Sequence, residues 1–330
     1  MDGITKRFFT RTALAGALSL SGLGLMLGGA LVSEPASAIS YGVSDCNEAG
    51  TECGNPNVVF LAALTWLGET RAHCTGSFVD RKDGYCLFVT AGHCTNAWNS
   101  WFNPGYATGV GVSLLPSVPK TVSAYGGRTF DPAAFVSTVQ WVTHSQFTRG
   151  FISKFDYGFV AVPVAELEAR FPNAAAVIPV TLAADGPLSL ESLVAEASNP
   201  QQDLKFFSVG YGIGELLNFG SNAGGGASDP RAWLGTRRLA EMQTYDNLRE
   251  TLLQTSQNPA LGNDGTCNGD SGGPTYYQVP GGGAVQVGIT SAGDYQCRAT
   301  GTYSRTDTAV FRDFLACARA NIGNLKQCGF

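Results

Sequence analysis

Short apolar stretches rich in β-branched residues recur along most of the chain, and Gly, Pro, Asn or Asp separates each stretch from the next. This spacing is typical of an all-β sandwich or barrel. Helical segments do not alternate with the stretches, as they would in a parallel βαβ sheet. The expected strands are residues 58–66, 76–79, 85–90, 136–142, 159–164, 206–209 and 285–290.

Only two stretches have the pattern of a helix. Residues 164–171 predict a short helix within a loop, whereas residues 308–322 have an apolar face that predicts a C-terminal helix docked on the barrel. Residues 182–204 and the Gly-rich residues 218–228 are expected to be surface loops. The side chains on the apolar face are Val310, Phe311, Phe314, Leu315 and Ala318.

The chain carries little charge, which excludes several classes of protein. Charged residues make up 14% of the 330 residues, against about 25% in an average soluble domain. The net charge is -5 and the 21 Lys and Arg form no cluster, so a nucleic-acid partner is not expected. The nine cysteines favour an oxidising compartment over the cytosol.

The first 38 residues have the pattern of a removable export signal. Basic residues, Lys6 and Arg7 among them, precede an apolar run over residues 12–32, and residues 36–38 are Ala-Ser-Ala, typical of a cleavage site. A membrane anchor is the alternative, because a run of this length could span a bilayer. Both the general secretory and the twin-arginine route stay open, since Lys6 replaces one Arg of the twin-arginine motif. Removal of this signal predicts a secreted chain that begins at Ile39 and has no membrane segment.

Three motifs contain residues that can act together in nucleophilic catalysis. Gly269-Asp270-Ser271-Gly272-Gly273 predicts a tight turn that exposes a nucleophilic Ser, with Gly residues that let a substrate carbonyl approach backbone amides. An incidental Ser in a Gly-rich turn is the alternative. Two motifs upstream disfavour it, because His93 follows a strand and offers a general base, and Asp156 leads into an apolar strand and can orient that base.

In the order His93, Asp156, Ser271, these motifs resemble those of the chymotrypsin/trypsin-like serine peptidase family. The phrase Gly92-His93 looks more like the bacterial streptogrisin branch than the animal one. The resemblance implies two six-stranded antiparallel β-barrels with a C-terminal helix, in a peptidase domain over residues 58–330. The active site would lie between the barrels, with His93 and Asp156 on the first and Ser271 on the second.

The resemblance also implies roles for individual residues. His93, Asp156 and Ser271 would form the catalytic triad, and the backbone amides of Gly269 and Ser271 would form the oxyanion hole. The substrate-binding positions would be Gly265, Ser291, Gly293 and Gly301, with Gly265 at the floor of the pocket and Ser291 beside Asp156.

The expected pocket is uncharged, because Gly265 brings no carboxylate. Such a pocket favours large apolar or aromatic side chains before the cut. Asp264 and Asp294 each lie one residue from a pocket position, so a preference for Lys or Arg stays open.

The family pattern further pairs Cys74 with Cys94 and Cys267 with Cys297. Five cysteines then remain, and one of them must stay unpaired or bridge two chains. The near pairs are favoured, namely Cys46 with Cys53 in an N-terminal segment over residues 39–57 and Cys317 with Cys328, which would leave Cys86 as a buried free thiol.

In this family a freed amino terminus pairs with the Asp before the nucleophile, which here is Asp270. The hypothesis is that Ile39 serves this role without a separate propeptide. Lys205 is a competing internal cation for Asp270.

The expected function is therefore a secreted serine endopeptidase that acts on protein or peptide substrates through an acyl-enzyme, as a monomer and without a cofactor. Protein inhibitors are candidate partners. A catalytically silent double-barrel binding protein and an esterase-like hydrolase with the same triad are the alternatives. No metal site is expected, because neither His73 nor His144 lies in a metal-ligand spacing.

Overall fold

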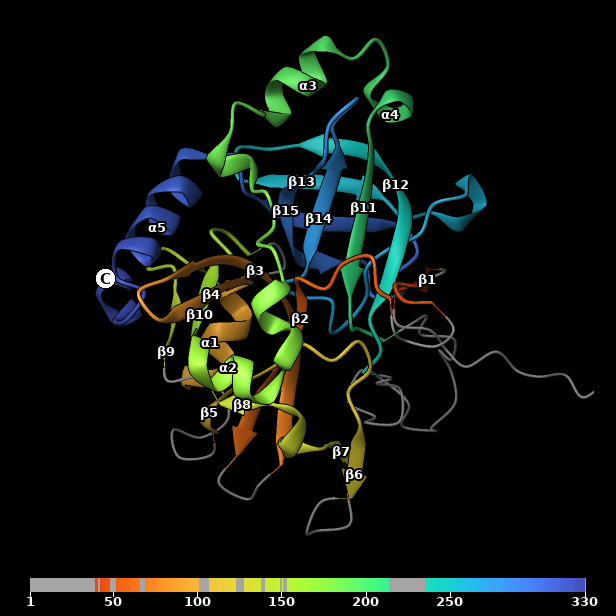
Figure 1. Cartoon of the computed structure of the whole chain (residues 1–330). Coiled ribbons are helices and arrows are strands. Elements are labelled where there is room, and N and C mark those ends of the chain that lie inside the picture. Colours follow the sequence, from red (N-terminus) through yellow and green to blue (C-terminus); the bar gives the residue numbers. More distant parts are fainter. Residues whose placement is uncertain are drawn as a thin grey trace, which may run out of the picture. The chain divides into compact units, whose positions relative to one another are not determined.

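The structure is a computed structural model (Figure 1). It describes residues 39–40, 42–47, 52–65, 69–122, 128–137, 140–148, 150, 153–213 and 235–329, except residues 101–106. The expected export signal and the loop expected at residues 218–228 lie outside these residues. Within them, no helix is both long enough and apolar enough to span a bilayer.

The second half of the chain forms a closed antiparallel barrel, called here the second barrel. Its strands follow the order β12-β11-β14-β15-β16-β13, and β13 pairs back with β12. The short strand β1 (Val43–Ser44) pairs with Leu239 and Arg238 at the start of β12, beyond the residues of β12 that pair with β13. The bounds are β11 Lys205–Gly210, β12 Arg238–Leu248, β13 Leu252–Ser256, β14 Pro274–Gln278, β15 Ala284–Gly293 and β16 Thr300–Arg305.

The first half forms a seven-stranded antiparallel sheet in the order β8-β5-β2-β3-β4-β10-β9, called here the first sheet. Its two edge strands are consecutive in the chain, with only residues 138 and 139 between them, so the sheet must curl until its edges approach. A separate hairpin joins β6 (Lys120–Val122) to β7 (Arg128–Phe130). The bounds are β2 Val58–Thr65, β3 Thr70–Lys82, β4 Tyr85–Thr90, β5 Ala107–Ser113, β8 Val136–Ser137, β9 Gln140–Thr143 and β10 Gly158–Pro163.

The double-barrel fold expected from the resemblance is thus confirmed, with one difference. The second barrel is closed by six strands, whereas the first sheet has seven strands and its edges are not paired within the described residues. The difference follows from the interrupted strand at residues 136–142, which contributes β8 to one edge and β9 to the other.

Helices are few. The two expected helices are present as α2 (Val164–Arg170) and α5 (Ala309–Ala320). The expectation of a loop over residues 182–204 is wrong, because α3 (Leu190–Glu196) and α4 (Pro200–Asp203) lie there. The Ser189 hydroxyl accepts a hydrogen bond from the Ser192 amide at the start of α3, and Pro200 occupies the first turn of α4, so each helix has a local start signal.

The helix α5 lies against the first sheet although it follows the last strand of the second barrel (Figure 1). The Phe314 ring lies 4.9 Å from that of Phe159, and the Phe311 ring lies 5.1 Å from that of Tyr157. The apolar face read from the sequence is the face that is buried, with Phe311, Phe314, Leu315 and Ala318 in the core. The C-terminal helix therefore joins the two halves of the fold.

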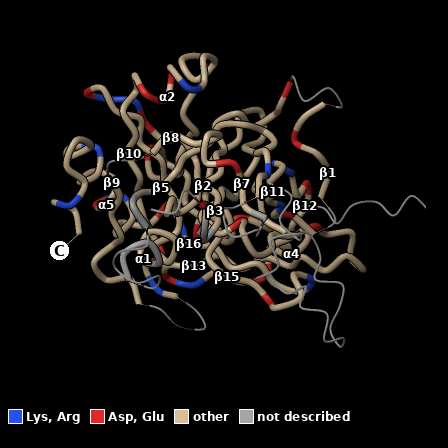
Figure 2. The backbone as a smooth tube through the Cα atoms, turned by 90° about the horizontal axis from the view of Figure 1, so that it is seen from below, with Lys and Arg blue, Asp and Glu red and all other residues tan. Residues whose placement is uncertain are grey.

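The charged side chains are spread thinly over the backbone. Figure 2 shows the Lys and Arg of the described residues at scattered positions on a tube that is mostly uncharged.

Candidate active site

His93 lies in the first turn of α1 (Gly92–Ser100), directly after β4. The sequence predicted that His93 follows a strand but did not predict this helix. A Cβ atom at Gly92 would lie 2.9 Å from the Tyr157 carbonyl oxygen and 3.2 Å from Asp156 Oδ1. Glycine at position 92 therefore lets the start of this helix approach Asp156 closely.

Asp156 binds His93 through both carboxylate oxygens. His93 Nδ1 lies 2.8 Å from Oδ2, and the His93 backbone amide donates to Oδ1 at 2.7 Å. The Ser291 hydroxyl donates to Oδ2 at 2.6 Å. The three groups come from α1, the loop before β10 and β15, so residues from both halves of the fold meet at one carboxylate.

The Asp156 carboxylate is fully buried, while the His93 side chain is 29% exposed. Burial raises the pKa of Asp156, but the charge of His93 and the hydrogen bonds from His93 and Ser291 outweigh burial and hold this pKa below its ordinary value. An ionised Asp156 keeps the proton of the imidazole on Nδ1, so that Nε2, on the far side of the ring, can act as a base.

The Ser271 turn packs against the first sheet next to α1. The Thr75 amide donates to the Ser271 carbonyl at 2.8 Å, and Cys94 Sγ lies 3.7 Å from the same oxygen. Gly272 has a φ of 84°, and a Cβ atom there would lie 2.0 Å from Thr90 Oγ1. The glycine after Ser271 thus allows the turn to lie against Thr90 at the end of β4, three residues before His93.

Two backbone amides around Ser271 have no hydrogen-bond acceptor among the described residues. Within the described part of the chain, the Gly269 and Ser271 amides donate no hydrogen bond, whereas the amides of Asp270, Gly272 and Gly273 each donate one. Gly269 has a φ of 96°, a conformation that favours glycine. Two donors on one turn can stabilise a developing oxyanion.

The predicted pocket positions lie in one region of the second barrel. Gly293 and Gly301 are register partners on β15 and β16. Gln257, which the sequence did not single out, lies between the strands: its side chain comes within 2.3 Å of a Cβ atom placed at Gly265 and 3.7 Å of one at Gly293. Its carboxamide exchanges two hydrogen bonds with the backbone of Thr266. Because a carboxamide carries no charge, the group beside Gly265 is neutral.

The two carboxylates near the pocket are bound by local backbone. Asp264 accepts a hydrogen bond from the Glu241 amide at 2.9 Å. Asp294 accepts from the amides of four residues that follow it. Burial raises the pKa of Asp294, but these four amides outweigh burial, so that its pKa lies below its ordinary value.

Asp270 is buried in a glycine-lined cradle. The amides of Cys267 and Gly212 donate to its carboxylate at 2.8 Å and 2.7 Å, and a Cβ atom at Gly210 would lie 2.1 Å from Oδ1. Burial raises the pKa of Asp270 to about 7, although the two amides oppose this shift. The competing cation Lys205 is exposed and starts β11, whereas Gly210 ends it, so Lys205 does not reach Asp270.

The N-terminal segment lies beside Gly265, the expected floor of the pocket. Ile39 and Ser40 are both buried. The Ser40 amide donates to the Gly265 carbonyl at 2.9 Å, and the Gly265 amide donates back at 3.1 Å.

The cysteines pair as the resemblance and the near spacings suggested. The bridges are Cys46–Cys53, Cys74–Cys94, Cys267–Cys297 and Cys317–Cys328, and Cys86 is a free, buried thiol. Burial raises the pKa of Cys86, so its reactive thiolate form is disfavoured.

The histidine environment does not favour a metal. The potential ligand atoms of Cys74, His93 and Cys94 lie within 4.8 Å of one another, but the disulfide removes both thiolates that a metal would need. The His73 ring packs 4.9 Å from that of Phe130, and the His144 ring packs 4.9 Å from that of Phe314. Both rings are therefore part of aromatic packing.

The comparison with protein families concerns the second half of the chain. The trypsin family model matches residues 209–314. The matched span contains Ser271 and the pocket positions but neither His93 nor Asp156. A search of curated proteins finds no match. Residues 209–314 are thus similar to the trypsin family, and the double-barrel fold fits the resemblance of the sequence motifs to chymotrypsin/trypsin-like serine peptidases.

Proposed function

We propose that the protein is a secreted serine endopeptidase in which His93, Asp156 and Ser271 form the catalytic triad. The observation that carries the proposal is the Asp156 carboxylate, which binds Nδ1 and the backbone amide of His93 while Ser291 donates to it. The position of the Ser271 turn beside Cys94 supports the same reading.

The proposed reaction assigns a step to each of these groups. His93 Nε2 takes the proton of the Ser271 hydroxyl as Oγ attacks the carbonyl carbon of the peptide bond. The amides of Gly269 and Ser271 donate to the resulting oxyanion. His93 then gives the proton to the leaving amine, which breaks the carbon–nitrogen bond and leaves an acyl group on Oγ. His93 then takes a proton from a water molecule as the water attacks the acyl carbon, and it returns this proton to Ser271 Oγ as the carbon–Oγ bond breaks and the acid leaves.

The substrate class is a protein or peptide with an uncharged side chain before the cut, preferably large and apolar or aromatic. The neutral Gln257 carboxamide beside Gly265 supports this preference. Asp264 and Asp294 both bind backbone amides, which disfavours a role for either as the counter-charge of a Lys or Arg substrate.

Activation would follow export. After removal of residues 1–38, the new ammonium group of Ile39 would pair with Asp270. The buried position of Ile39 and the raised pKa of the Asp270 carboxyl support this step, because a buried acid gains from a nearby positive charge.

The test compares the secreted protein with its Ser271→Ala variant, which lacks only the nucleophile. The wild type is expected to react with a serine-directed phosphonate and to cleave a peptide library fastest after aromatic or large apolar residues. The variant should fold, be exported and show neither activity, with turnover lower by several orders of magnitude.

Equal labelling of the variant would reject Ser271 as the nucleophile. Fastest cleavage after Arg would reject the neutral pocket. Turnover of esters without turnover of peptides would favour an esterase, and a wild type that reacts with neither would favour a silent binding protein.

A further inference from the structure

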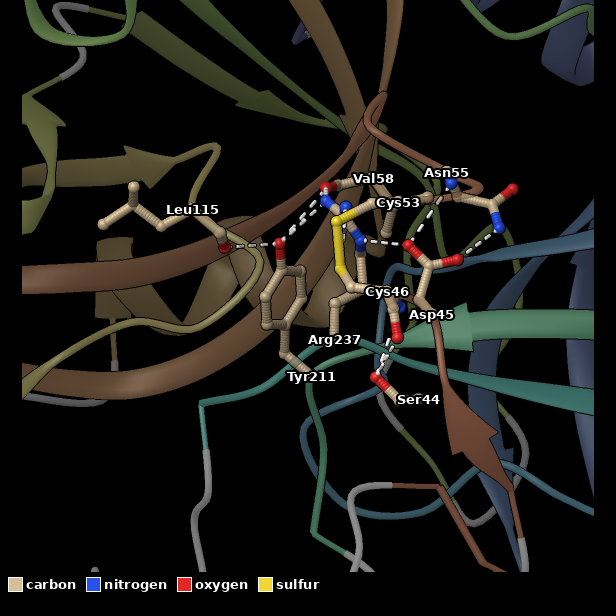
Figure 3. Close-up of polar contacts among 9 residues, drawn as sticks. All are labelled: Ser44, Asp45, Cys46, Cys53, Asn55, Val58, Leu115, Tyr211 and Arg237. Atoms are coloured by element: carbon tan, nitrogen blue, oxygen red, sulfur yellow. Dashed lines mark hydrogen bonds and ion pairs between the residues drawn. A yellow bond between two sulfur atoms is a disulfide. The ribbon is translucent and has the colours of Figure 1, made fainter. Parts of the chain in front are cut away.

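A buried ion pair fixes the N-terminal segment to the second barrel (Figure 3). Arg237 Nε lies 2.6 Å from Asp45 Oδ2, and each side chain is only 1% exposed. Arg237 directly precedes β12, and Asp45 directly follows β1. The two residues are 192 positions apart in the chain.

Arg237 also contacts both halves of the fold. Its Nη1 donates to the Val58 carbonyl at 2.9 Å, where β2 of the first sheet begins, and to the Tyr211 hydroxyl at 3.2 Å. Tyr211 follows β11 of the second barrel and donates to the Leu115 carbonyl at 2.8 Å. One guanidinium thus links the N-terminal segment, the first sheet and the second barrel, as Figure 3 shows.

Asn55 also binds the Asp45 carboxylate. The Asn55 side-chain amide donates to Oδ1 at 2.6 Å, and the Asn55 backbone amide donates to Oδ2 at 3.2 Å. The Cys46–Cys53 bridge closes the loop between these two residues. Arg237 and Asn55 therefore both bind the Asp45 carboxylate. Loss of the charge of Asp45 or of Arg237 would leave the other charge buried without an ion-pair partner.

The segment before Asp45 leads to the pocket. Val43 and Ser44 pair with Leu239 and Arg238 of β12, and three residues before Val43, Ser40 makes its two hydrogen bonds with Gly265. A two-residue edge strand is a weak attachment on its own. The buried ion pair and the Asp45 amide, which donates to the Arg237 carbonyl at 3.3 Å, attach this segment at a second place, five residues after Ser40.

We propose that Asp45 and Arg237 are positioning residues for the substrate pocket, which act on Gly265 through the segment from Ser40 to Ser44. The inference rests on the proposed function for the role of Gly265, but the attachment itself does not need catalysis. Neither residue touches the reacting atoms, so both should affect the binding of the substrate side chain more than the chemical step.

Hydrogen exchange tests the attachment in the Ser271→Ala chain, which cannot digest itself if the proposed function holds. Asp45→Asn should raise the exchange rates of the Ser40 and Gly265 amides about tenfold or more and leave the Thr75 amide unchanged. Asn55→Ala keeps the charges of Asp45 and Arg237 and should raise the same two exchange rates by a smaller factor. It replaces Asp45→Asn as the test variant if Asp45→Asn does not fold. Glu168→Gln is the matched control, because it breaks a half-exposed ion pair with Arg81 elsewhere. Unchanged exchange at Gly265 in both test variants overturns the proposal.

Kinetics test the consequence in the chain that keeps Ser271. For peptides with a large side chain before the cut, Asp45→Asn should raise KM about fivefold to tenfold, with kcat per phosphonate-titrated site within about twofold of wild type. A merely destabilised enzyme would instead show fewer titrated sites and an unchanged KM, which overturns the positioning role. A wild type without activity would reject the proposed function, and hydrogen exchange would still decide whether the ion pair holds Gly265.

Discussion

Asp156 and Asp270 are both fully buried carboxylates, yet their pKa values shift in opposite directions. Burial raises the pKa of each, but at Asp156 the charge of His93 and three hydrogen bonds from His93 and Ser291 reverse the effect. Asp270 has only two amide donors. The partner groups, and not the depth of burial, therefore decide which carboxylate is ionised.

The first prediction concerns Asp156. Asp156→Asn keeps the shape but removes the charge that holds the Nδ1 proton, so kcat should fall by about 10⁴. Ser291→Ala removes one donor at 2.6 Å from the same carboxylate and should lower kcat by only about tenfold, because His93 still binds Asp156. Peptide turnover of both variants, with circular dichroism to confirm folding, checks this order. An equal loss in the two variants would contradict the role given to Asp156.

The second prediction concerns Asp270. In the chain whose Ile39 is still in a peptide bond, the folded-state pKa of Asp270 is about 7 against an ordinary value of 3.8. The folded state then binds more protons than the unfolded state between these values, so the free energy of unfolding should fall as pH rises from about 4 to about 7. Asp270→Asn should remove this part of the pH dependence, as measured by urea unfolding of the unprocessed Ser271→Ala chain.

A chain that begins at Ile39 provides the complementary measurement. Its free ammonium group should lower the pKa of Asp270, and the loss of stability between about pH 4 and 7 should shrink. The same pH dependence in both chains would reject the pairing of Ile39 with Asp270.

At the scale of elements, the sequence predicted best those strands that are apolar on both faces. Residues 85–90 were expected as a strand, and β4 has these bounds because five of its six residues are buried. β12 was missed because Arg238, Glu241, Gln243 and Asp246 interrupt its apolar pattern. It forms nevertheless, since its neighbours β11 and β13 supply hydrogen bonds on both sides.

The helix that carries His93 was also missed. Its sequence, Gly-His-Cys-Thr-Asn-Ala-Trp-Asn-Ser, has no acidic residue in the first turn and no basic residue in the last, so it lacks the usual charge signals of a helix. Its backbone is instead fixed by tertiary contacts, among them the His93 amide on Asp156 and the Cys74–Cys94 bridge.

The sequence singles out the residues of the proposed triad because each lies in a local motif. Gln257 and the Asp45–Arg237 pair could not, because their contacts join distant parts of the chain and leave no periodic pattern. A Gln that binds the backbone of Thr266 resembles any surface Gln until the fold brings it beside Gly265.

At the scale of the whole molecule, the two halves are joined by many buried contacts. Thr75 of β3 donates through its hydroxyl to the Gly269 carbonyl at 2.9 Å, and the Tyr157 hydroxyl donates to the Arg305 carbonyl of β16 at 2.8 Å. The helix α5 adds an apolar contact with the first sheet. Because the site is assembled from both halves, these contacts also fix the position of Ser271 relative to His93.

This coupling predicts that the two halves unfold together. Phe314 on α5 is 5% exposed and packs on Phe159 of the first sheet, so Phe314→Ala should lower the free energy of unfolding by about 3–5 kcal/mol. Ile178→Ala is the control, because Ile178 is 76% exposed and its loss should change stability by less than about 0.5 kcal/mol. Urea unfolding of the Ser271→Ala chain, followed by tryptophan fluorescence and by far-ultraviolet circular dichroism, should give one coincident transition in every variant. Two separate transitions in Phe314→Ala would show that α5 stabilises only the first sheet and that the second barrel folds without it.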